Sequence, residues 1–272
     1  HFIIKKKNEF LFARDRLGIK PFFYTKNNNE ISFSSNIRSI LKYNKRNYNF
    51  DLESVSAFFS FRQPLGDKTF YKGIKSLNPG NYIQIKNNKI IIKEYWSQKK
   101  FFLQNKKDKG EKYYLEKLED LLKSSIKYRL ISDVKIASLL SGGLDSSLIT
   151  TIMQQKIGKN SLAFSIGYDQ KNYNEFEYSK FISNKLGIKH RIIHSNAEEY
   201  FDDLDELISL RGQPLTIPNE ASQYRLCKEI KKEATVVLSG SGADELFCGY
   251  GRIFGSADDY DKILNLRSFD NK

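Results

Sequence analysis

With 272 residues, 40% of them hydrophobic, the chain is long enough for one large or two ordinary domains with a sizeable core. No apolar run approaches the ~20 residues of a membrane span, so we expect no membrane partner. The two cysteines, Cys227 and Cys248, form neither a zinc spacing nor a disulfide framework, so we expect a cytoplasmic location. The net charge is +13, but the lysines are scattered among asparagines without a basic stripe, so we expect no nucleic-acid partner.

The first 96 residues are predicted to be rich in β-strands. Short apolar runs bounded by Lys/Asn turns predict strands at 2–4, 9–13, 21–24, 31–33, 82–85 and 90–95. The predicted helices are 36–41 and 51–59. Asp51 is suited to cap the second helix, and Asn87-Asn88 is suited to the turn of a hairpin between the last two strands.

A charged turn interrupts this region between Ala13 and Phe22. Arg14 and Asp15 end a predicted strand, Gly18 frees the backbone, and Pro21 restarts an extended segment. Two interpretations are open at this point. The pair is either a surface ion pair of little energetic value or part of a binding loop.

Residues 97–111 are rich in Lys, Gln and Asn, with Gly110 near the end, and are predicted to be a linker. Apolar residues then recur at helical spacing through 112–128, which predicts an amphipathic helix. That helix leads to the apolar strand 134–140.

Strands and helices alternate from there to residue 238. The predicted strands are 134–140, 162–166, 191–193 and 235–238, and the predicted helices begin near 148, 175, 197 and 219. This alternation predicts an open parallel sheet that binds ligands at the carboxyl ends of its strands. His190 and His194 flank the third strand, and without a carboxylate partner at ligand spacing they are interpreted as strand-end residues rather than metal ligands.

The stretch from Ser141 to Ser147, Ser-Gly-Gly-Leu-Asp-Ser-Ser, follows the first of these strands and opens a helix. Two glycines allow a tight turn with open amide groups at the positive end of a helix dipole, which suits a phosphate or pyrophosphate. Serine hydroxyls add donors, and Asp145 offers a carboxylate to Mg²⁺. It is not a Walker loop, because no Gly-Lys-Ser/Thr closes it. The alternative is an ordinary strand-to-helix turn capped by serines.

A second glycine loop, Ser239 to Tyr250, follows the fourth strand in the same way. If the two strands are neighbours, Asp145 and Asp244 reach one cleft, where two carboxylates and phosphate oxygens make a Mg²⁺ site. Alternatively, Asp244 and Glu245 only stabilise the first turn of a following helix.

These motifs resemble known families. The first glycine loop resembles the pyrophosphate loop of ATP-pyrophosphatases. The Arg14-to-Phe22 segment, with Thr69–Lys75 and Pro79-Gly80, resembles N-terminal-nucleophile glutamine amidotransferases. Together with Gly-Ala-Asp-Glu-Leu-Phe-Cys-Gly-Tyr at 242–250, in this order, they resemble the B type of glutamine-hydrolysing asparagine synthetase.

The resemblance implies an α/β chain of two parts. A β-rich remnant of an N-terminal-nucleophile glutaminase domain, 1–96, is followed after the linker by a parallel-sheet ATP-pyrophosphatase domain of the adenine nucleotide α-hydrolase-like type, 112–272. The implied activity adenylates the side chain of aspartate with ATP and Mg²⁺, releases pyrophosphate, and transfers ammonia from glutamine to give asparagine, AMP and glutamate. A homodimer is compatible with it.

The resemblance also assigns site residues. The implied ATP contacts are Leu140, Ile166, Ser239 and Gly240. The implied pyrophosphate ligands are Ser141, Gly142, Gly143, Asp145, Ser146 and Ser147. Asp145 and Asp244 are the implied catalytic residues, as Mg²⁺ ligands, and Asp15 would hold the α-amino group of glutamine.

Two departures from the family pattern open alternatives. Ser241 stands where these synthetases usually carry Glu, which weakens aspartate as the substrate and favours a related enzyme that adenylates another carboxylate, such as a sugar acid or a peptide. The chain also begins at His1, downstream of the expected cysteine nucleophile, and ends at Lys272, so we expect this piece alone to be inactive. A tRNA-modifying enzyme with the same loop, and a relative that only binds nucleotide, are further alternatives.

Overall fold

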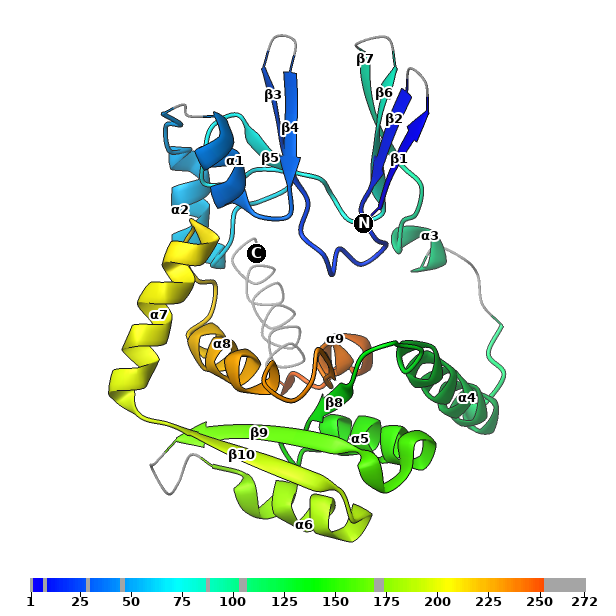
Figure 1. Ribbon diagram of the computed structural model, residues 1–272. Helices are drawn as coiled ribbons and strands as arrows, with labels where there is room; N and C mark the ends of the chain where they lie inside the picture. The colour runs from blue at the N-terminus through cyan, green and yellow to red at the C-terminus, as the bar shows by residue number, and fades with distance from the viewer. Residues whose placement is uncertain are drawn as a thin grey trace, which may run out of the picture. The chain divides into compact units, whose positions relative to one another are not determined.

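The computed structural model describes residues 2–6, 9–27, 30–44, 47–86, 89–102, 107–168 and 174–251 (Figure 1). The chain divides into two compact units. The first consists of His1–Asp108 with Glu198–Tyr224, and the second of Lys109–Ala197 with Arg225–Lys272. Within the described ranges, no helix combines the length and the apolar character needed to cross a membrane.

The first unit contains two antiparallel sheets. One has the order β1 (Phe2–Lys6), β2 (Glu9–Ala13), β6 (Asn81–Lys86), β7 (Lys89–Glu94), and the other β4 (Glu30–Ser34), β3 (Phe23–Asn27), β5 (Ile74–Ser76). The predicted hairpin is confirmed, since Lys86 pairs with Lys89; its Asn87-Asn88 turn lies outside the described residues. The core of this unit includes Phe12 of β2, Ile83 of β6 and Phe22, which directly precedes β3.

Two helices accompany these sheets. α1 (Ile37–Asn44) runs three residues beyond its predicted end and buries Ile37 and Ile40, one helical turn apart, against Ile74 of β5. α2 (Leu52–Phe61) begins as predicted after Asp51, whose carboxylate accepts a hydrogen bond from the Glu53 N–H at 3.3 Å. A cap of this kind is worth about 1 kcal/mol.

The segment predicted to be a linker, 97–111, contains the short helix α3 (Lys99–Phe102), and 103–106 lie outside the described residues. α7 (Ala197–Arg211) belongs almost entirely to the first unit. The Tyr71 hydroxyl donates to the Gly212 carbonyl at 2.7 Å, and the Asn36 amide donates to the Leu210 carbonyl at 3.0 Å. Packing thus groups the end of α7 with the β-rich unit, and the domain boundaries at 96 and 112 stay a prediction.

The second unit is built on one parallel sheet of order β10 (Lys189–Ser195), β9 (Leu162–Tyr168), β8 (Ile136–Leu139), β11 (Val236–Leu238). All three strand pairings are parallel, which confirms the predicted fold class. β10 is longer than predicted, so His190 and His194 lie within it instead of flanking it.

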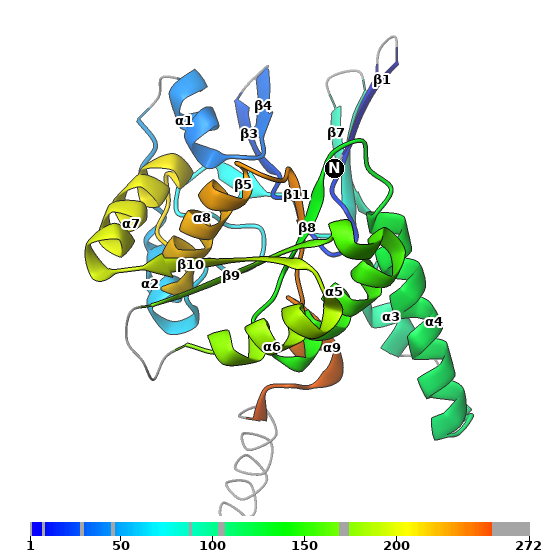
Figure 2. The ribbon, with the colours of Figure 1, turned by 60° about the horizontal axis from the view of Figure 1, so that its bottom comes forward.

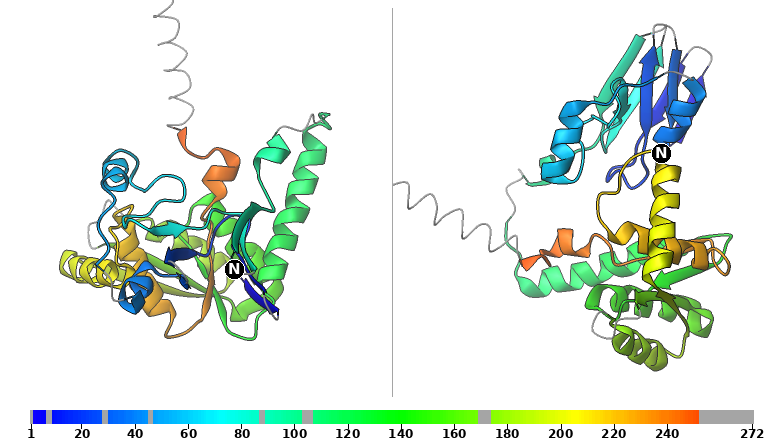
Figure 3. Two further views of the ribbon diagram at one scale, coloured as in Figure 1. Left: turned by 90° about the horizontal axis from the view of Figure 1, so that it is seen from above. Right: turned by 90° about the vertical axis from the view of Figure 1, so that its left-hand side faces the viewer.

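Helices cover both faces of this sheet (Figures 1 and 3). They are α4 (Glu111–Arg129), α5 (Leu144–Ile157), α6 (Phe176–Leu186) and the second half of α8 (Asn219–Ile230), and the short α9 (Ala243–Phe247) follows β11. Successive side chains of β8 point to opposite faces: Ile136 packs with α4 and α5, and Ala137 packs with Leu226 and Ile230 of α8. Ser138, again on the α5 face, accepts a hydrogen bond from Thr150 at 3.0 Å, which anchors α5 to β8.

An ion-pair cluster joins β10 to the turn before β11. Glu233 accepts hydrogen bonds from Arg191 at 2.7 Å and from Lys189 at 2.9 Å, and these bonds hold its pKa down to about 2. Because the folded state lowers this pKa, its contribution to stability is complete above the unfolded pKa of about 4.3 and is lost as the pH falls toward about 2.

We therefore expect Glu233→Gln to lower the free energy of unfolding at pH 7 and to lower it by much less at pH 2.5, close to the folded pKa. Urea titrations of both proteins at the two pH values measure this difference. A destabilisation of the same size at both pH values would show that the carboxylate charge is not its source.

Candidate functional site

The sheet order places the two glycine loops side by side. The chain goes from β8 to β9 and β10 on one side, then returns to the other side of β8 as β11, so the switch point of the sheet lies between β8 and β11 (Figure 2). Both strands are parallel, and their carboxyl ends meet at one edge. In open α/β sheets, ligands bind outside the carboxyl ends of the strands at this point. The predicted neighbourhood of the first and fourth strands is confirmed.

The first loop is supported by its own serines. The Ser146 hydroxyl accepts a hydrogen bond from the Ser141 N–H at 3.2 Å, lies 2.9 Å from the Ser141 hydroxyl, and donates to the Gly143 carbonyl at 3.1 Å. The Ser141 hydroxyl also accepts from the Gly143 N–H at 3.2 Å. These bonds fold the residues between β8 and α5 into a compact turn.

Position 142 requires glycine, because of its backbone conformation and because no room is left for a side chain. Its φ is +93°, and a Cβ built on it would lie 2.5 Å from Tyr178 Cβ and 2.7 Å from the backbone nitrogen of Ser179. The loop therefore lies directly against the first turn of α6. No other residue type fits this position without moving the helix.

We expect Gly142→Ala to destabilise the protein by more than the about 1–2 kcal/mol that a left-handed backbone alone costs an L-residue. Gly187→Ala is the matched control, because Gly187 has φ +63° and ψ +36°, in the left-handed region, and nothing within 4 Å of a built Cβ. The difference between the two variants in the free energy of unfolding should reach about 1 kcal/mol or more, the usual cost of overpacking. Equal costs would mean that the contact with α6 is loose.

The start of α5 offers hydrogen-bond donors to an anion. Its N-cap is Gly143, which makes no side-chain cap, so the first amides of this 14-residue helix are open to a ligand. The Ser147 hydroxyl is buried and is without a hydrogen-bond partner in the part of the chain that the structure describes. A buried hydroxyl left unpaired costs about 1–3 kcal/mol, which a phosphate oxygen would recover. The residues present therefore fit a phosphate group.

The second loop packs onto the first. A Cβ built on Gly240 would lie 2.9 Å from Asp145 Cβ and 3.1 Å from the Ser146 nitrogen, so the strand end after β11 touches the first turn of α5. Ser239 stabilises this loop by accepting a hydrogen bond from the Ser241 N–H at 3.4 Å. The structure thus brings together Asp145, Ser146, Ser239 and Gly240, which the sequence predicted for one site.

Asp244 lies in the first turn of α9, and its carboxylate lies over its own loop. A Cβ built on Gly249 would be 1.8 Å from Asp244 Oδ1, and the Gly249 N–H donates to the Asp244 carbonyl at 3.0 Å. The described residues hold no group of three or more His, Cys, Asp or Glu side chains that could bind a metal. Asp145 and Asp244 therefore fit Mg²⁺ only if phosphate oxygens complete its ligands.

Leu140 and Ile166 differ in their surroundings. Leu140 is buried directly after β8, and its N–H donates to the Phe164 carbonyl at 2.8 Å. Its own carbonyl accepts a hydrogen bond from the Ser165 hydroxyl. Ile166 lies within β9, two residues before the strand ends, and packs partly buried against the core on the α8 face.

Sequence reasoning missed the contacts of His190. Its Nε2 lies 2.7 Å from the Ser165 hydroxyl, and its Nδ1 lies 3.1 Å from the Ser183 hydroxyl. Burial, and then the charge of Lys180, lower the pKa of His190 below its ordinary value. His194 instead stacks edge-on with Phe176 at 5.1 Å between ring centroids. The signal in the sequence was only a serine in an otherwise apolar strand.

In the first unit, Arg14 and Asp15 both bond to the backbone around them. The Asp15 carboxylate accepts from the N–H groups of Ile19 and Lys20, each at 3.0 Å. The Arg14 guanidinium donates to the carbonyls of Lys20, Leu77 and Gly18 and to the Ser76 hydroxyl. The two side chains therefore organise a loop, which is more than a surface ion pair does.

The charge of Asp15 is favoured in the folded state. Burial raises the pKa of this carboxyl, but hydrogen bonds from the backbone N–H groups of Lys20, Ile19 and Leu17 lower it, and the net pKa lies below its ordinary value. Asp15 is thus an ionised acceptor at neutral pH, the form that binds an ammonium group.

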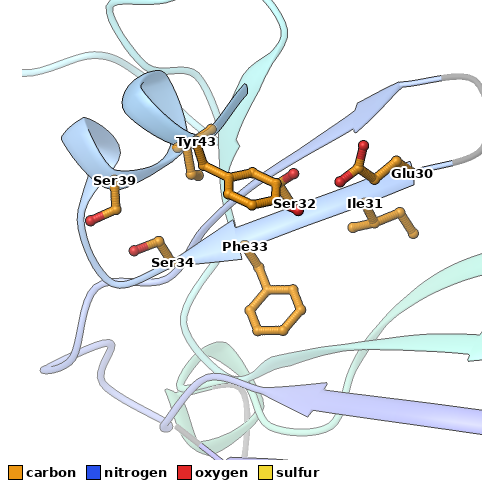
Figure 4. Close-up of a pocket in the computed structure, with 8 residues that line it drawn as sticks. Glu30, Ile31, Ser32, Phe33, Ser34, Ser39 and Tyr43 are labelled. Atoms are coloured by element: carbon orange, nitrogen blue, oxygen red, sulfur yellow. The ribbon is translucent and has the colours of Figure 1, made fainter. Parts of the chain in front are cut away.

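A cavity of about 450 Å³ opens between β4 and α1 in the first unit (Figure 4). Its lining includes Glu30, Ser32, Ser34, Ser39 and Tyr43. None of the predicted site residues lines it, so the sequence did not point to it.

Known families match both parts of the chain. A family model described as asparagine synthase matches residues 117–267, more than half of the chain, and one described as glutamine amidotransferase domain matches residues 2–96. Glutamine-hydrolyzing asparagine synthetase 1 of Bacillus subtilis (strain 168) is 31% identical over 99% of this chain and 41% of its own length. Glutamine-hydrolyzing asparagine synthetase 3 of that organism is 30% identical over 98% of this chain and 48% of its own length.

The chain spans less than half the length of these two curated relatives. A solved structure of NMN synthetase from Francisella tularensis overlaps with 53% of this chain and 59% of that chain, at 23% identity and a TM-score of 0.36. Both glycine loops lie in the stretch matched as asparagine synthase, and Asp15 lies in the stretch matched as amidotransferase. From these matches, the chain belongs to the asparagine synthase family.

Proposed function

We propose that the intact protein forms an amide by adenylating the side-chain carboxylate of aspartate with ATP. Pyrophosphate leaves, and ammonia released from glutamine attacks the adenylate, which gives asparagine, AMP and glutamate. The observation that carries the ATP half is the packing of Gly240 on Asp145 and Ser146, because it joins the two glycine loops at the switch point of the sheet. The amidotransferase match of residues 2–96 supports the glutamine half.

In this proposal the loop after β8 holds the β- and γ-phosphates. The open amides in the first turn of α5 meet the phosphate oxygens, and the Ser147 hydroxyl gains the partner it lacks within the described chain. The dipole of α5 favours the negative charge that develops on pyrophosphate as the α-phosphate is attacked. Leu140, Ser239 and Gly240 contact the nucleoside from the strand ends, and Ile166 contacts it from within β9.

Asp145 and Asp244 would hold Mg²⁺ together with phosphate oxygens. When bound, the ion neutralises charge on the leaving pyrophosphate. The amidotransferase part would hold glutamine through Asp15, whose lowered pKa keeps the carboxylate charged. The proposed partners are small molecules only. We place the intact protein in the cytoplasm as a homodimer, and light scattering of the intact protein tests the dimer.

Product analysis tests the reaction class. The intact protein, incubated with aspartate, glutamine, ATP and Mg²⁺, should give asparagine, AMP and pyrophosphate in equal amounts by mass spectrometry. Formation of ADP and phosphate would overturn the proposal, because it would mean attack at the γ-phosphate. ATP·Mg²⁺ binding without any pyrophosphate release would favour a relative that only binds nucleotide.

A second candidate is the same chemistry on another carboxylate. Ser241 is exposed in the second loop and carries a hydroxyl, which is no base at neutral pH without an activating partner. A sugar acid or a peptide carboxylate is then the acceptor of AMP. Pyrophosphate release with these acids and none with aspartate would select this candidate.

A tRNA-modifying role has weaker support. Such an enzyme needs no glutaminase part, yet residues 2–96 match an amidotransferase domain. A tRNA shift assay at ~150 mM salt tests it, because non-specific binding weakens steeply with salt. We expect no shift.

A further inference from the structure

A line of hydrogen bonds crosses the second unit from α6 to the end of β8. The Ser183 hydroxyl donates to the Lys180 carbonyl at 3.0 Å and lies 3.1 Å from His190 Nδ1. On the other side of the ring, His190 Nε2 lies 2.7 Å from the Ser165 hydroxyl, which donates to the Leu140 carbonyl. Both serines are buried, and the imidazole is half-buried.

The number of available protons decides which atoms donate and which accept in these hydrogen bonds. Each serine hydroxyl has one proton, and in the arrangement above each proton is given to a carbonyl. Both ring nitrogens of His190 would then have to donate, which only the charged imidazolium can do. Burial and Lys180 disfavour that form, since they lower the pKa of His190. In the neutral ring, one serine must turn its proton from its carbonyl to a ring nitrogen.

Breaking the hydrogen bond from Ser183 to the Lys180 carbonyl costs less than breaking the one from Ser165 to the Leu140 carbonyl. Lys180 lies inside α6, where its carbonyl also accepts the helix N–H four residues on. Leu140 lies just beyond the end of β8. Its N–H still bonds to the Phe164 carbonyl of β9, and its carbonyl takes the Ser165 hydroxyl as donor. The neutral ring therefore carries its proton on Nε2, donates to Ser165, and accepts from Ser183 at Nδ1.

We propose that His190 is a positioning residue of the nucleotide site, whose Nε2–H orients the Ser165 hydroxyl onto the Leu140 carbonyl. That carbonyl belongs to the last residue before the glycine loop, so the line holds the point at which the loop leaves the sheet. This inference rests on the proposed function only in that the loop binds ATP.

Steady-state kinetics test the consequence. In the intact protein, Ser165→Ala should raise KM for ATP about fivefold to tenfold, the effect of one lost hydrogen bond, with KM for glutamine unchanged. His190→Ala should raise it by a similar factor, and His190→Gln, whose amide can donate to Ser165, should recover most of it. Arg191→Gln, the next residue of β10 and an exposed one, is the matched control and should leave KM for ATP unchanged. An unchanged KM for ATP in Ser165→Ala, in an active and folded protein, would overturn the inference.

A spectroscopic readout separates this inference from the proposed function. In intact protein labelled with ¹⁵N-histidine and assigned with the His190→Gln variant, the His190 nitrogen shifts at pH 7.5 should show a protonated Nε2 and an unprotonated Nδ1. Ser165→Ala should alter the Nε2 shift more than the Nδ1 shift. Protonation at Nδ1 would overturn the inference whether or not the protein makes asparagine, whereas failure of pyrophosphate release leaves this readout valid and contradicts the proposed function alone.

Discussion

Pyrophosphate release by the intact protein is expected to fall about a hundredfold or more when Asp145 is replaced by alanine. Asp145 lies in the first turn of α5, where Gly240 of the second loop packs against it. In the proposed site it is one of two carboxylates that hold Mg²⁺ on the phosphates. Its loss removes a charge that the metal needs, while the amides and serines that contact the phosphates remain.

The same change also has a cost in stability, which must be separated from the effect on catalysis. An acidic residue in the first turn of a helix contributes about 0.3–1 kcal/mol through the helix dipole. Asp145→Asn keeps the volume of the side chain and should lose activity as alanine does. Asp133→Ala is the matched control, because Asp133 is exposed before the amino end of β8, the opposite end of the strand. Normal pyrophosphate release in Asp145→Ala would show that the carboxylate holds no catalytic metal.

For Asp15, the expected result is a split between the two nitrogen donors. Asp15→Asn should lower kcat/KM for glutamine about 10- to 100-fold, the range expected when a hydrogen bond between charged groups is lost. Synthesis from added ammonia should be unchanged, because the glycine loops are not altered. The variant keeps one acceptor oxygen for the N–H groups of Ile19 and Lys20, which the carboxylate now binds. Rates with glutamine and with ammonium chloride measure the split.

Asp15→Ala is the harsher variant, since it leaves both N–H groups without their acceptor and is expected to loosen the loop that Arg14 also supports. Asp67→Asn serves as the matched control, because Asp67 is an acid of the same unit whose carboxylate pairs with Lys75 at 2.7 Å. It should affect neither donor. Equal loss with glutamine and ammonia in Asp15→Asn would contradict the separation of a glutaminase part from a synthetase part.

Local patterns in the sequence were sufficient for most of the elements. Alternation predicted the β6–β7 hairpin, helical spacing predicted α4, and Asp51 marked the start of α2. Boundaries were less accurate. β10 begins two residues earlier and ends two later than predicted, since pairing with β9 extends it beyond its apolar residues.

The candidate site, too, could be predicted from the sequence only in part. The types of residue in the two glycine loops already indicated phosphate and Mg²⁺ chemistry. Their meeting depended on β11 pairing with β8, a contact between residues about 100 positions apart. The pair of Ser165 and His190 could not be predicted, because a serine in an apolar strand does not indicate its partner. The two residues come together only through the parallel pairing of β9 with β10.

The amino-acid sequence by itself determined the local conformations and the chemical character of the loops, since propensity, turn residues and hydrophobic period act over a few neighbouring residues. Only the tertiary structure decided the order of the strands, the contact of Gly240 with Asp145, the hydrogen-bond partners of His190 and the grouping of α7 with the β-rich unit. These depend on which buried faces pack together, and burial of that kind is a property of the whole chain and not of any short segment of it.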